Sequence, residues 1–307
     1  MKKILFVFAA ALLTLAACTK VKSTADFQVS PYNVDNGKLF RFAVYDSTFA
    51  DTLTLDVWAP DGYDGTGAYP VMYMHDGQNI FDTVATWNHQ SWDMDKSAGK
   101  LIENGEIEPI IIVGIHCLGY TRIGDMMPEK AIPYIADSAE RAFTDTISGW
   151  RYRGDEYLYA IANTVKPFVD SLFATNPTAE KTSVMGSSMG GIISLYAFCE
   201  YPDVFRMAGC ISTHLGITQD RPAYAEAIFR YIRENMPKQD GRKLYMDNGN
   251  LDVDYNYIPY FNTLVTLVDS LGYDSAHFKS EFFEGQGHCE KDWASRMELP
   301  LKMFYGE

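Results

Sequence analysis

The sequence predicts an α/β fold with a mostly parallel central sheet and helices on both faces. From residue 69 onward, short apolar runs alternate with helical segments, which is the pattern of parallel strands joined by crossover helices. Within that alternation, residues 186–190 read Gly-Ser-Ser-Met-Gly between an apolar strand and a small-residue helix. No internal repeat or linker interrupts the pattern, so we expect one domain over residues 28–307.

Residues 28–61 differ from the rest because apolar and polar side chains alternate there. The stretches 40–45 and 52–58 have this period of two, which is typical of strands with one exposed face. We expect them to pair antiparallel at one edge of the sheet.

The remaining elements follow in order. A long loop is expected after the strand that ends at residue 115, and loops at strand ends commonly shape a ligand cleft. Pro167 is expected to kink the helix that contains it. Strands are predicted at 69–74, 108–115, 182–185, 205–212, 243–246 and 278–283, and helices at 92–103, 154–173, 192–199, 222–235, 260–271 and 290–304.

Composition narrows the class of protein. The chain has 307 residues, of which 47% are hydrophobic and 14% aromatic, as a packed core requires. The formal net charge is −14, which disfavours nucleic acid as a partner because phosphates would be repelled. The same charge disfavours electrostatic docking on anionic lipid.

The N-terminus is predicted to be a targeting segment. Lys2 and Lys3 precede the apolar stretch 4–15, which is too short to span a membrane. Leu15-Ala16-Ala17-Cys18 resembles the lipobox of bacterial lipoproteins, which implies removal of residues 1–17, acylation of Cys18 and a tether over 18–27. We therefore expect a lipid-anchored protein of the bacterial cell envelope, with an ordinary cleaved signal peptide as the alternative.

The other cysteines show no metal-binding spacing. Free buried thiols are expected, although one disulfide would be compatible with an oxidising compartment. These cysteines are Cys117, Cys199, Cys210 and Cys289.

Ser188 is the predicted nucleophile. It stands at the centre of Gly-x-Ser-x-Gly, and the strand before it and the helix after it form the nucleophile elbow of α/β-hydrolases. Gly186 and Gly190 lack a Cβ, so strand and helix can approach closely. The backbone N–H of Met189 then points to where an oxyanion would form. The alternative is a tight strand-to-helix connection without chemistry.

A serine nucleophile needs a base, and His288 is the best candidate. In this fold the base follows the acid in the chain and lies at a strand end, and His288 follows the strand 278–283 directly. His277 precedes that strand, at the wrong edge of the sheet. His214 follows the strand 205–212 and is expected to line the cleft or to be structural.

Asp252 is the predicted acid that orients the base. It follows the strand 243–246 by a few residues, in the loop from which a carboxylate must reach the imidazole. Asp254 is the second choice, and it could instead cap the next helix. Asp247 more plausibly ends the strand.

The loop after the strand 69–74 is expected to supply the second oxyanion donor. It begins His75-Asp76-Gly77-Gln78, and the corresponding loop of α/β-hydrolases has this role. Gly77 or Gln78 would be the donor, with His75 in the substrate cleft. Two alternatives are that His75 and Asp76 close a turn or bind a metal, but no further ligands follow at useful spacing.

The chain resembles the esterase family of α/β-hydrolases that holds enterochelin, feruloyl and acetyl-xylan esterases, esterase D and the antigen 85 mycolyltransferases. The resemblance implies that Ser188, Asp252 and His288 are nucleophile, acid and base. Two departures are Cys117-Leu118 and Thr213-His214, where relatives carry polar or aromatic residues. The likeness covers about 35–305 and rests on 69–79, 113–115 with Arg122, 154–157, 166–168, 186–191, Gly249 with Asp252, 287–288 and Trp293.

The residues and the resemblance together predict a serine carboxylic ester hydrolase without metal or cofactor. Its expected substrates are acetyl or feruloyl esters of carbohydrate, small or attached to polysaccharide. The alternatives are a siderophore lactone esterase, an acyltransferase, and a non-catalytic binding lipoprotein.

Overall fold

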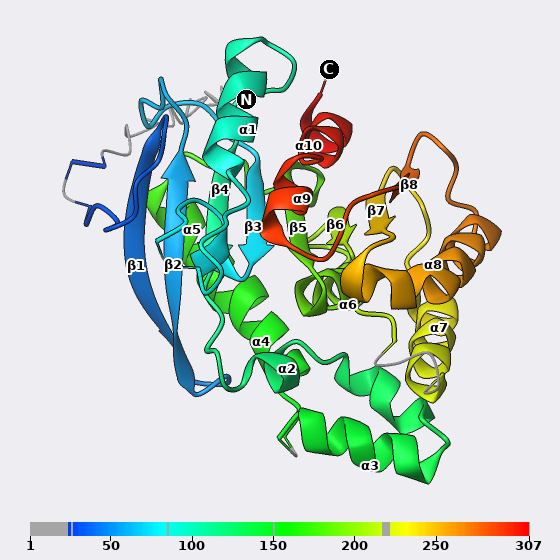
Figure 1. The fold of residues 1–307 in the computed structure, drawn as a ribbon. Coiled ribbons are helices and arrows are strands. Elements are labelled where there is room, and N and C mark those ends of the chain that lie inside the picture. The colour runs from blue at the N-terminus through cyan, green and yellow to red at the C-terminus, as the bar shows by residue number, and fades with distance from the viewer. Residues whose placement is uncertain (1–23, 26, 85, 150, 217–221, 307) are drawn as a thin grey trace, which may run out of the picture.

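An eight-stranded sheet forms the centre of the molecule (Figure 1). The computed structural model describes residues 24, 25, 27–84, 86–149, 151–216 and 222–306. The predicted signal peptide, Cys18 and most of the predicted tether lie outside these ranges. The strands are β1 (Lys38–Asp46), β2 (Asp51–Ala59), β3 (Val71–His75), β4 (Ile111–Ile115), β5 (Thr182–Ser187), β6 (Met207–Ile211), β7 (Lys243–Gly249) and β8 (Phe278–Phe283).

The pairing of the strands is mixed, as predicted. Their order is β1-β2-β4-β3-β5-β6-β7-β8. β2 pairs antiparallel with both β1 and β4, and every other pair is parallel. The prediction of antiparallel N-terminal strands on a mostly parallel sheet is therefore confirmed.

Helices cover both faces of the sheet. None of those in the described ranges combines the length and the apolar character needed to cross a bilayer. The helices are α1 (Met94–Glu103), α2 (Arg122–Asp125), α3 (Ser138–Ile147), α4 (Gly154–Ala160), α5 (Lys166–Leu172), α6 (Met189–Glu200), α7 (Ala223–Asn235), α8 (Asp252–Ser270), α9 (Glu290–Ala294) and α10 (Glu298–Tyr305).

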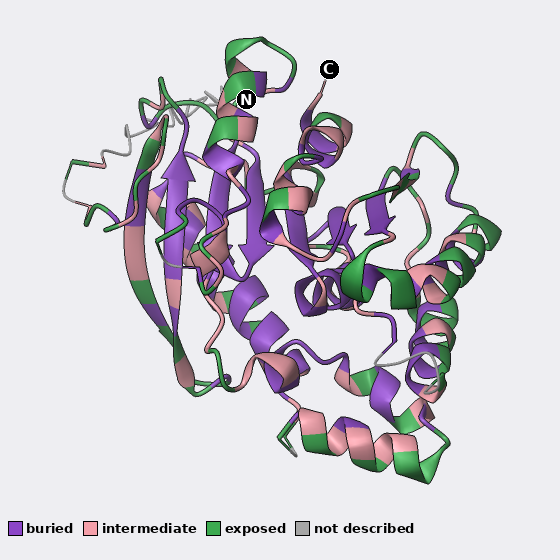
Figure 2. Cartoon of the chain, in the orientation of Figure 1, coloured by how far each residue is buried: buried purple, intermediate pink, exposed green. Residues whose placement is uncertain are grey.

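Two apolar cores lie on opposite faces of the sheet. Along β3, Val71 and Tyr73 join one core, whereas Met72 and Met74 join the other, because side chains alternate along a strand. Helices α4–α8 contribute to the first core, and α1, α9 and α10 to the second. Figure 2 shows the middle strands buried throughout and the outer strands β1 and β8 only in part.

Several helix boundaries differ from those predicted. The helix at 154–173 is divided into α4 and α5 by a π-helical turn, Ile161–Val165, just before Pro167. Proline cannot donate a backbone hydrogen bond, and a wider turn accommodates that loss. The loop after β4 contains α2 and α3, the latter capped by Asp137, whose side chain accepts from the N–H of Glu140. α8 begins at Asp252, eight residues earlier than expected.

His75 belongs to the core and not to the substrate cleft. It ends β3 with a relative exposure of 2%, and its Nδ1 lies 2.8 Å from the hydroxyl of Tyr157 in α4. Its Nε2 is buried and has no partner among the described residues. Burial lowers the pKa of His75 to about 4, because a charged imidazole would lose its hydration there. The predicted cleft role is therefore corrected.

We predict that His75 makes the fold sensitive to acid. The unfolded chain binds a proton near pH 6.5 and the folded chain only near pH 4, so stability is complete above pH 6.5 and falls as the pH drops. The free energy of unfolding should decrease by about 2 kcal/mol more between pH 7 and 5 in the native protein than in His75→Gln. Chemical denaturation at both pH values measures this difference.

The exposed His89 supplies the control. His89→Gln should keep the native dependence on pH. The prediction would be refuted if the free energy of unfolding fell equally between pH 7 and 5 in the native protein and in His75→Gln.

Candidate active site

The carboxyl ends of the parallel strands meet at one edge of the sheet, and a cleft opens there. It has a volume of about 310 Å³. The predicted nucleophile and base both face it, which brings together residues a hundred positions apart. The cleft is lined by Asp76, Gln78, Asn79, Trp87, Cys117, Arg122, Ser187, Ser188, His288, Glu290 and Trp293.

Ser188 occupies a strained turn between β5 and α6. Its φ of 56° and ψ of −118° are rare for a residue with a side chain. A Cβ on Gly186 would lie 2.8 Å from the carbonyl carbon of Gly190, so only glycine permits this approach. The N–H of Ser188 donates to the carbonyl of Ile211, and the carbonyl of Ser188 accepts from the N–H of His214, each at 3.0 Å. These bonds tie the turn to the end of β6.

The start of α6 offers backbone donors beside Ser188. Met189 is the first residue of the helix, and the first N–H groups of a helix have no intrahelical acceptor. Across the cleft, Gln78 lies on the wall, whereas Gly77 packs so closely on β4 that a Cβ would lie 2.4 Å from the carbonyl carbon of Gly114. Of the two predicted loop donors, Gln78 is therefore the one that faces the cleft.

The imidazole of His288 contacts Asp254 and not Asp252. Its Nδ1 lies 2.6 Å from Oδ1 of Asp254, whose side chain is fully buried. Asp252 is exposed in the first turn of α8 and covers Gly287 instead. Asp252 has a left-handed backbone with φ 54° where α8 begins, whereas Asp254 follows inside the helix, and it is Asp254 that contacts the imidazole. The predicted partner is corrected to Asp254, the second choice.

The carboxylate of Asp254 is held by three hydrogen bonds. Besides His288, it accepts from the hydroxyl of Ser212 at 2.6 Å and from the N–H of Gly249 at 3.0 Å. The hydroxyl of Ser212 in turn accepts from Trp293 Nε1 and Arg296 Nη2. A hydroxyl has one proton to donate, so with both acceptor positions in use it must donate to Asp254.

A second buried acid lies behind this network. Asp247 pairs with Arg296 at 3.2 Å and accepts from the N–H of Ser212. Burial raises the pKa of Asp247 to about 6, although Arg296 opposes the shift. Asp247 lies inside β7, which continues to Gly249, so the prediction that it ends the strand is wrong.

The loop after β3 is fixed by an ion pair at the cleft. Both carboxylate oxygens of Asp76 accept from Arg122, at 2.6 and 2.7 Å. Burial alone would raise the pKa of Asp76, but the charge of Arg122 outweighs it and lowers that pKa. Beside the pair, the Gln78 side chain donates to Cys117 Sγ and accepts from its N–H. Cys117 thus makes polar contacts through its backbone N–H and its thiol, at a position where relatives carry a polar residue.

The opposite wall carries Glu290 and Trp87. Glu290 is buried and accepts from the side-chain amides of Asn79 and Asn88. Trp87 keeps 85% of its surface exposed although it lines the cleft. Neither role was predicted, because both depend on loops without a periodic pattern.

His214 lies behind Ser188 and is not among the residues that line the cleft. Its Nδ1 is 2.8 Å from the hydroxyl of Tyr257 in α8. Tyr257 is a contact that the sequence analysis missed, since it treated residues 252–259 as a loop. With the helix beginning at Asp252, its spacing of three from Asp254 would have placed both residues on one face.

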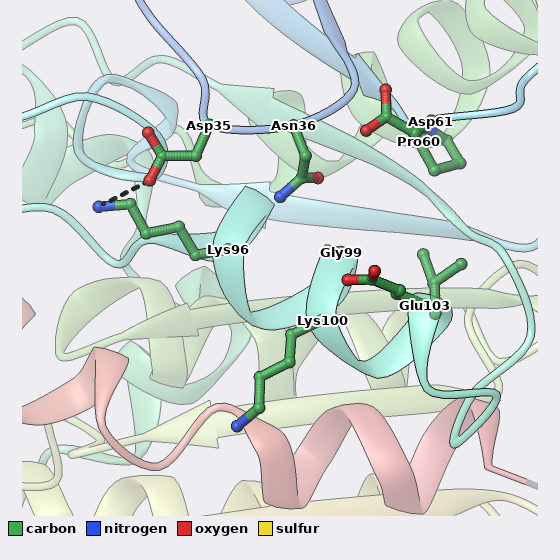
Figure 3. Close-up of a pocket in the computed structure, with 9 residues that line it drawn as sticks. Asp35, Asn36, Pro60, Asp61, Lys96, Gly99, Lys100 and Glu103 are labelled. Atoms are coloured by element: carbon green, nitrogen blue, oxygen red, sulfur yellow. Dashed lines mark ion pairs between the residues drawn. The ribbon is translucent and has the colours of Figure 1, made fainter.

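A larger hollow lies at the opposite edge of the sheet, where the parallel strands begin (Figure 3). Its volume is about 640 Å³, and Lys96 pairs with Asp35 across it at 3.5 Å. The described residues that line it include no serine, cysteine or histidine. Within the described ranges, no group of three or more potential ligands is arranged to hold a metal ion. The four described cysteines are free thiols, as predicted, but only Cys199 and Cys210 are buried, whereas Cys117 and Cys289 are partly exposed.

Comparison with known proteins identifies the family. A family model described as "Putative esterase" matches residues 47–299. The uncharacterized protein YbbA of Bacillus subtilis is 24% identical over 161 residues, which are 51% of this chain and 54% of that protein. The chain thus spans about half the length of this curated relative.

Two solved structures share the fold. A ferulic acid esterase superposes with a TM-score of 0.64 at 16% identity, covering 88% of this chain and 98% of that one. The enterobactin esterase FES of Shigella flexneri superposes with a TM-score of 0.62 at 14% identity, covering 91% and 60%. With the family model matching most of the chain, the protein belongs to this esterase family and has the α/β-hydrolase fold.

Proposed function

We propose that the chain hydrolyses carboxylic esters with Ser188 as nucleophile, His288 as base and Asp254 as the acid that orients the base. The observation that carries the proposal is the 2.6 Å contact between His288 Nδ1 and Asp254. It leaves Nε2 of His288 to serve the cleft that Ser188 also lines. This is the order of roles in a serine–histidine–acid triad.

In the first half of the reaction, Ser188 Oγ attacks the ester carbonyl while its proton passes to His288 Nε2. Asp254 keeps Nδ1 protonated and stabilises the imidazolium that forms. The N–H groups of Met189 and Gln78 donate to the oxyanion. His288 then protonates the leaving alcohol, and the acyl group stays on Ser188.

In the second half, water replaces the alcohol. His288 takes a proton from the water, which attacks the acyl-enzyme, and the acid leaves as Ser188 regains its proton. Buried Asp254 makes three hydrogen bonds and so remains an acceptor for the imidazole throughout both halves.

The charges of the cleft favour uncharged esters such as acetylated or feruloylated carbohydrates. Arg122 is the one cation among the described residues that line the cleft, and both carboxylate oxygens of Asp76 accept from it. Glu290 adds a negative charge to the wall. An anionic substrate would therefore meet no unpaired cation among the described lining residues. Trp87 and Trp293 supply flat apolar surface of the kind on which sugar or aromatic rings pack.

The siderophore lactone alternative is less well supported, because Asp76 already pairs with Arg122. Catecholate and carboxylate groups call for basic side chains, and the one guanidinium in the cleft is already paired. Acyl transfer to a sugar or lipid remains an alternative outcome of the same acyl-enzyme, distinguished by product analysis with an added acceptor alcohol.

The cellular location is part of the proposal and rests on sequence alone. The lipobox-like Leu15-Ala16-Ala17-Cys18 supports acylation of Cys18 and attachment to the bacterial envelope. Carbohydrate esters outside the cytoplasm would be accessible to an enzyme held there.

We predict that Ser188→Ala abolishes covalent labelling by a fluorophosphonate and lowers kcat by about 10³-fold or more. The hydroxyl is the only group removed, and Ser187→Ala at the end of β5 is the neighbouring control that should still label. Labelling is detected by intact-protein mass spectrometry. A native protein that remains unlabelled would favour the binding-lipoprotein alternative.

The two aspartates of α8 provide a matched pair of variants. Asp254→Asn should lower kcat by about 10³-fold, since an amide would favour the wrong imidazole tautomer. Asp252→Asn should stay within about twofold of the native rate, because Asp252 is exposed and does not contact His288. Steady-state kinetics on an acetyl ester checks both, and the reverse ranking would restore Asp252 as the acid.

We predict a preference for uncharged substrates. Acetyl and feruloyl sugar esters should give a kcat/KM at least about tenfold above that of a catecholate lactone, since one unpaired charge in a cleft costs a kilocalorie or more. The comparison uses purified protein and matched concentrations. Preference for the lactone would overturn the carbohydrate assignment without affecting the triad.

A further inference from the structure

Tyr257 connects three parts of the active site that are distant in sequence. It lies in α8, three residues after Asp254, and is 3% exposed. Its hydroxyl is 2.8 Å from Nδ1 of His214, and its ring meets that of His288 edge to face at 5.8 Å. Burial raises the pKa of Tyr257, and a hydrogen bond with the side chain of Ser188 opposes that rise.

His214 is held in place independently of this contact. Its N–H donates to the carbonyl of Ser188 at 3.0 Å, and its ring packs against Tyr224 with centroids 5.6 Å apart. Nε2 of His214 is buried and has no partner among the described residues. Among the described residues, Nδ1 is therefore the ring nitrogen of His214 that meets a polar group, and that group is the hydroxyl of Tyr257.

Both side chains are neutral at physiological pH. Burial lowers the pKa of His214 to about 4, with further lowering from His288 and Arg122. Burial also raises the pKa of Tyr257 above its ordinary value. A neutral imidazole has one N–H and one acceptor nitrogen, so the pair can relay a hydrogen bond but cannot replace His288 as a base.

We propose that Tyr257 is a further catalytic residue whose hydroxyl donates a hydrogen bond to Ser188 Oγ, and that His214 is the positioning residue that orients this hydroxyl. The inference rests on the proposed function. Because Ser188 has a single proton that must go to His288 Nε2, its oxygen can only accept from Tyr257. The oxygen of Tyr257 then accepts from Nδ1–H of His214.

A hydrogen bond from Tyr257 to Ser188 Oγ affects both halves of the reaction. Negative charge builds on Ser188 Oγ when its proton leaves for His288, and again when Oγ departs from the acyl-enzyme. A donor aimed at that oxygen stabilises both transition states. Tyr257 keeps its proton throughout, so no additional proton is transferred.

The test is Tyr257→Phe, which removes the hydroxyl and keeps the ring beside His288. We expect the rate of fluorophosphonate labelling at Ser188 and the kcat on an acetyl ester to fall about tenfold, with little change in KM. Tyr224→Phe is the matched control: it removes another buried hydroxyl beside His214, one without a hydrogen-bond partner among the described residues, and should remain within about twofold of the native rate.

A double variant tests the role of His214. His214→Ala should slow labelling, whereas His214→Asn, which keeps an N–H donor, should recover most of the rate. His214→Ala combined with Tyr257→Phe should be no slower than Tyr257→Phe alone, because His214 acts through that hydroxyl. Thermal unfolding confirms that each variant is folded.

The outcomes separate this inference from the proposed function. A native protein that fluorophosphonate does not label at Ser188 contradicts the proposed function itself. Normal labelling of the native protein with an unchanged rate in Tyr257→Phe overturns the role of Tyr257. Additive effects in the double variant overturn the role of His214.

Discussion

The strained turn at Ser188 is the constraint on which the site depends. Its backbone is rare for serine and persists because hydrogen bonds to Ile211 and His214 fix both of its polar groups. The close approach of Gly186 and Gly190 lets α6 begin at the next residue. The same geometry therefore exposes the hydroxyl, aims helix N–H groups beside it and anchors the backbone of His214.

Around that turn, Asp254, Asp76 and Arg122 are engaged by opposite charges or hydrogen-bond donors, whereas Glu290 is held, among the described residues, by two amides alone. Asp254 accepts three hydrogen bonds, and its donor Ser212 has no capacity left. Arg122 donates from Nε and Nη2, along one edge of its guanidinium, to the two carboxylate oxygens of Asp76. Such pairing preorganises the site, since breaking any one bond would leave a charge buried without compensation. It also leaves the cleft without an unpaired cation among its described lining residues, which links the architecture to the proposed preference for neutral esters.

The acid was misplaced because the sequence pattern conceals where α8 begins. Residues 252–259 mix acidic and aromatic side chains and end in Pro259, which is unfavourable inside a helix. Packing overrides that preference: Asp254 and Tyr257 are buried on the inner face. The early start of the helix turns Asp252 outward and Asp254 inward. It also places Tyr257 beside Ser188, which a loop assignment could not anticipate.

The alternation of strands and helices, the elbow at Ser188 and the position of His288 after the last strand could be predicted from the amino-acid sequence, because periodicity and glycine spacing are local properties of the chain. Three features become visible only in the folded chain: the contact of Asp254 with the imidazole, the burial of His75 in the core and the contact of His214 with Tyr257. These depend on helix phase and on contacts between residues tens of positions apart. A shift of one or two residues in where a helix begins rotates its side chains to another face, and the linear pattern does not specify that rotation.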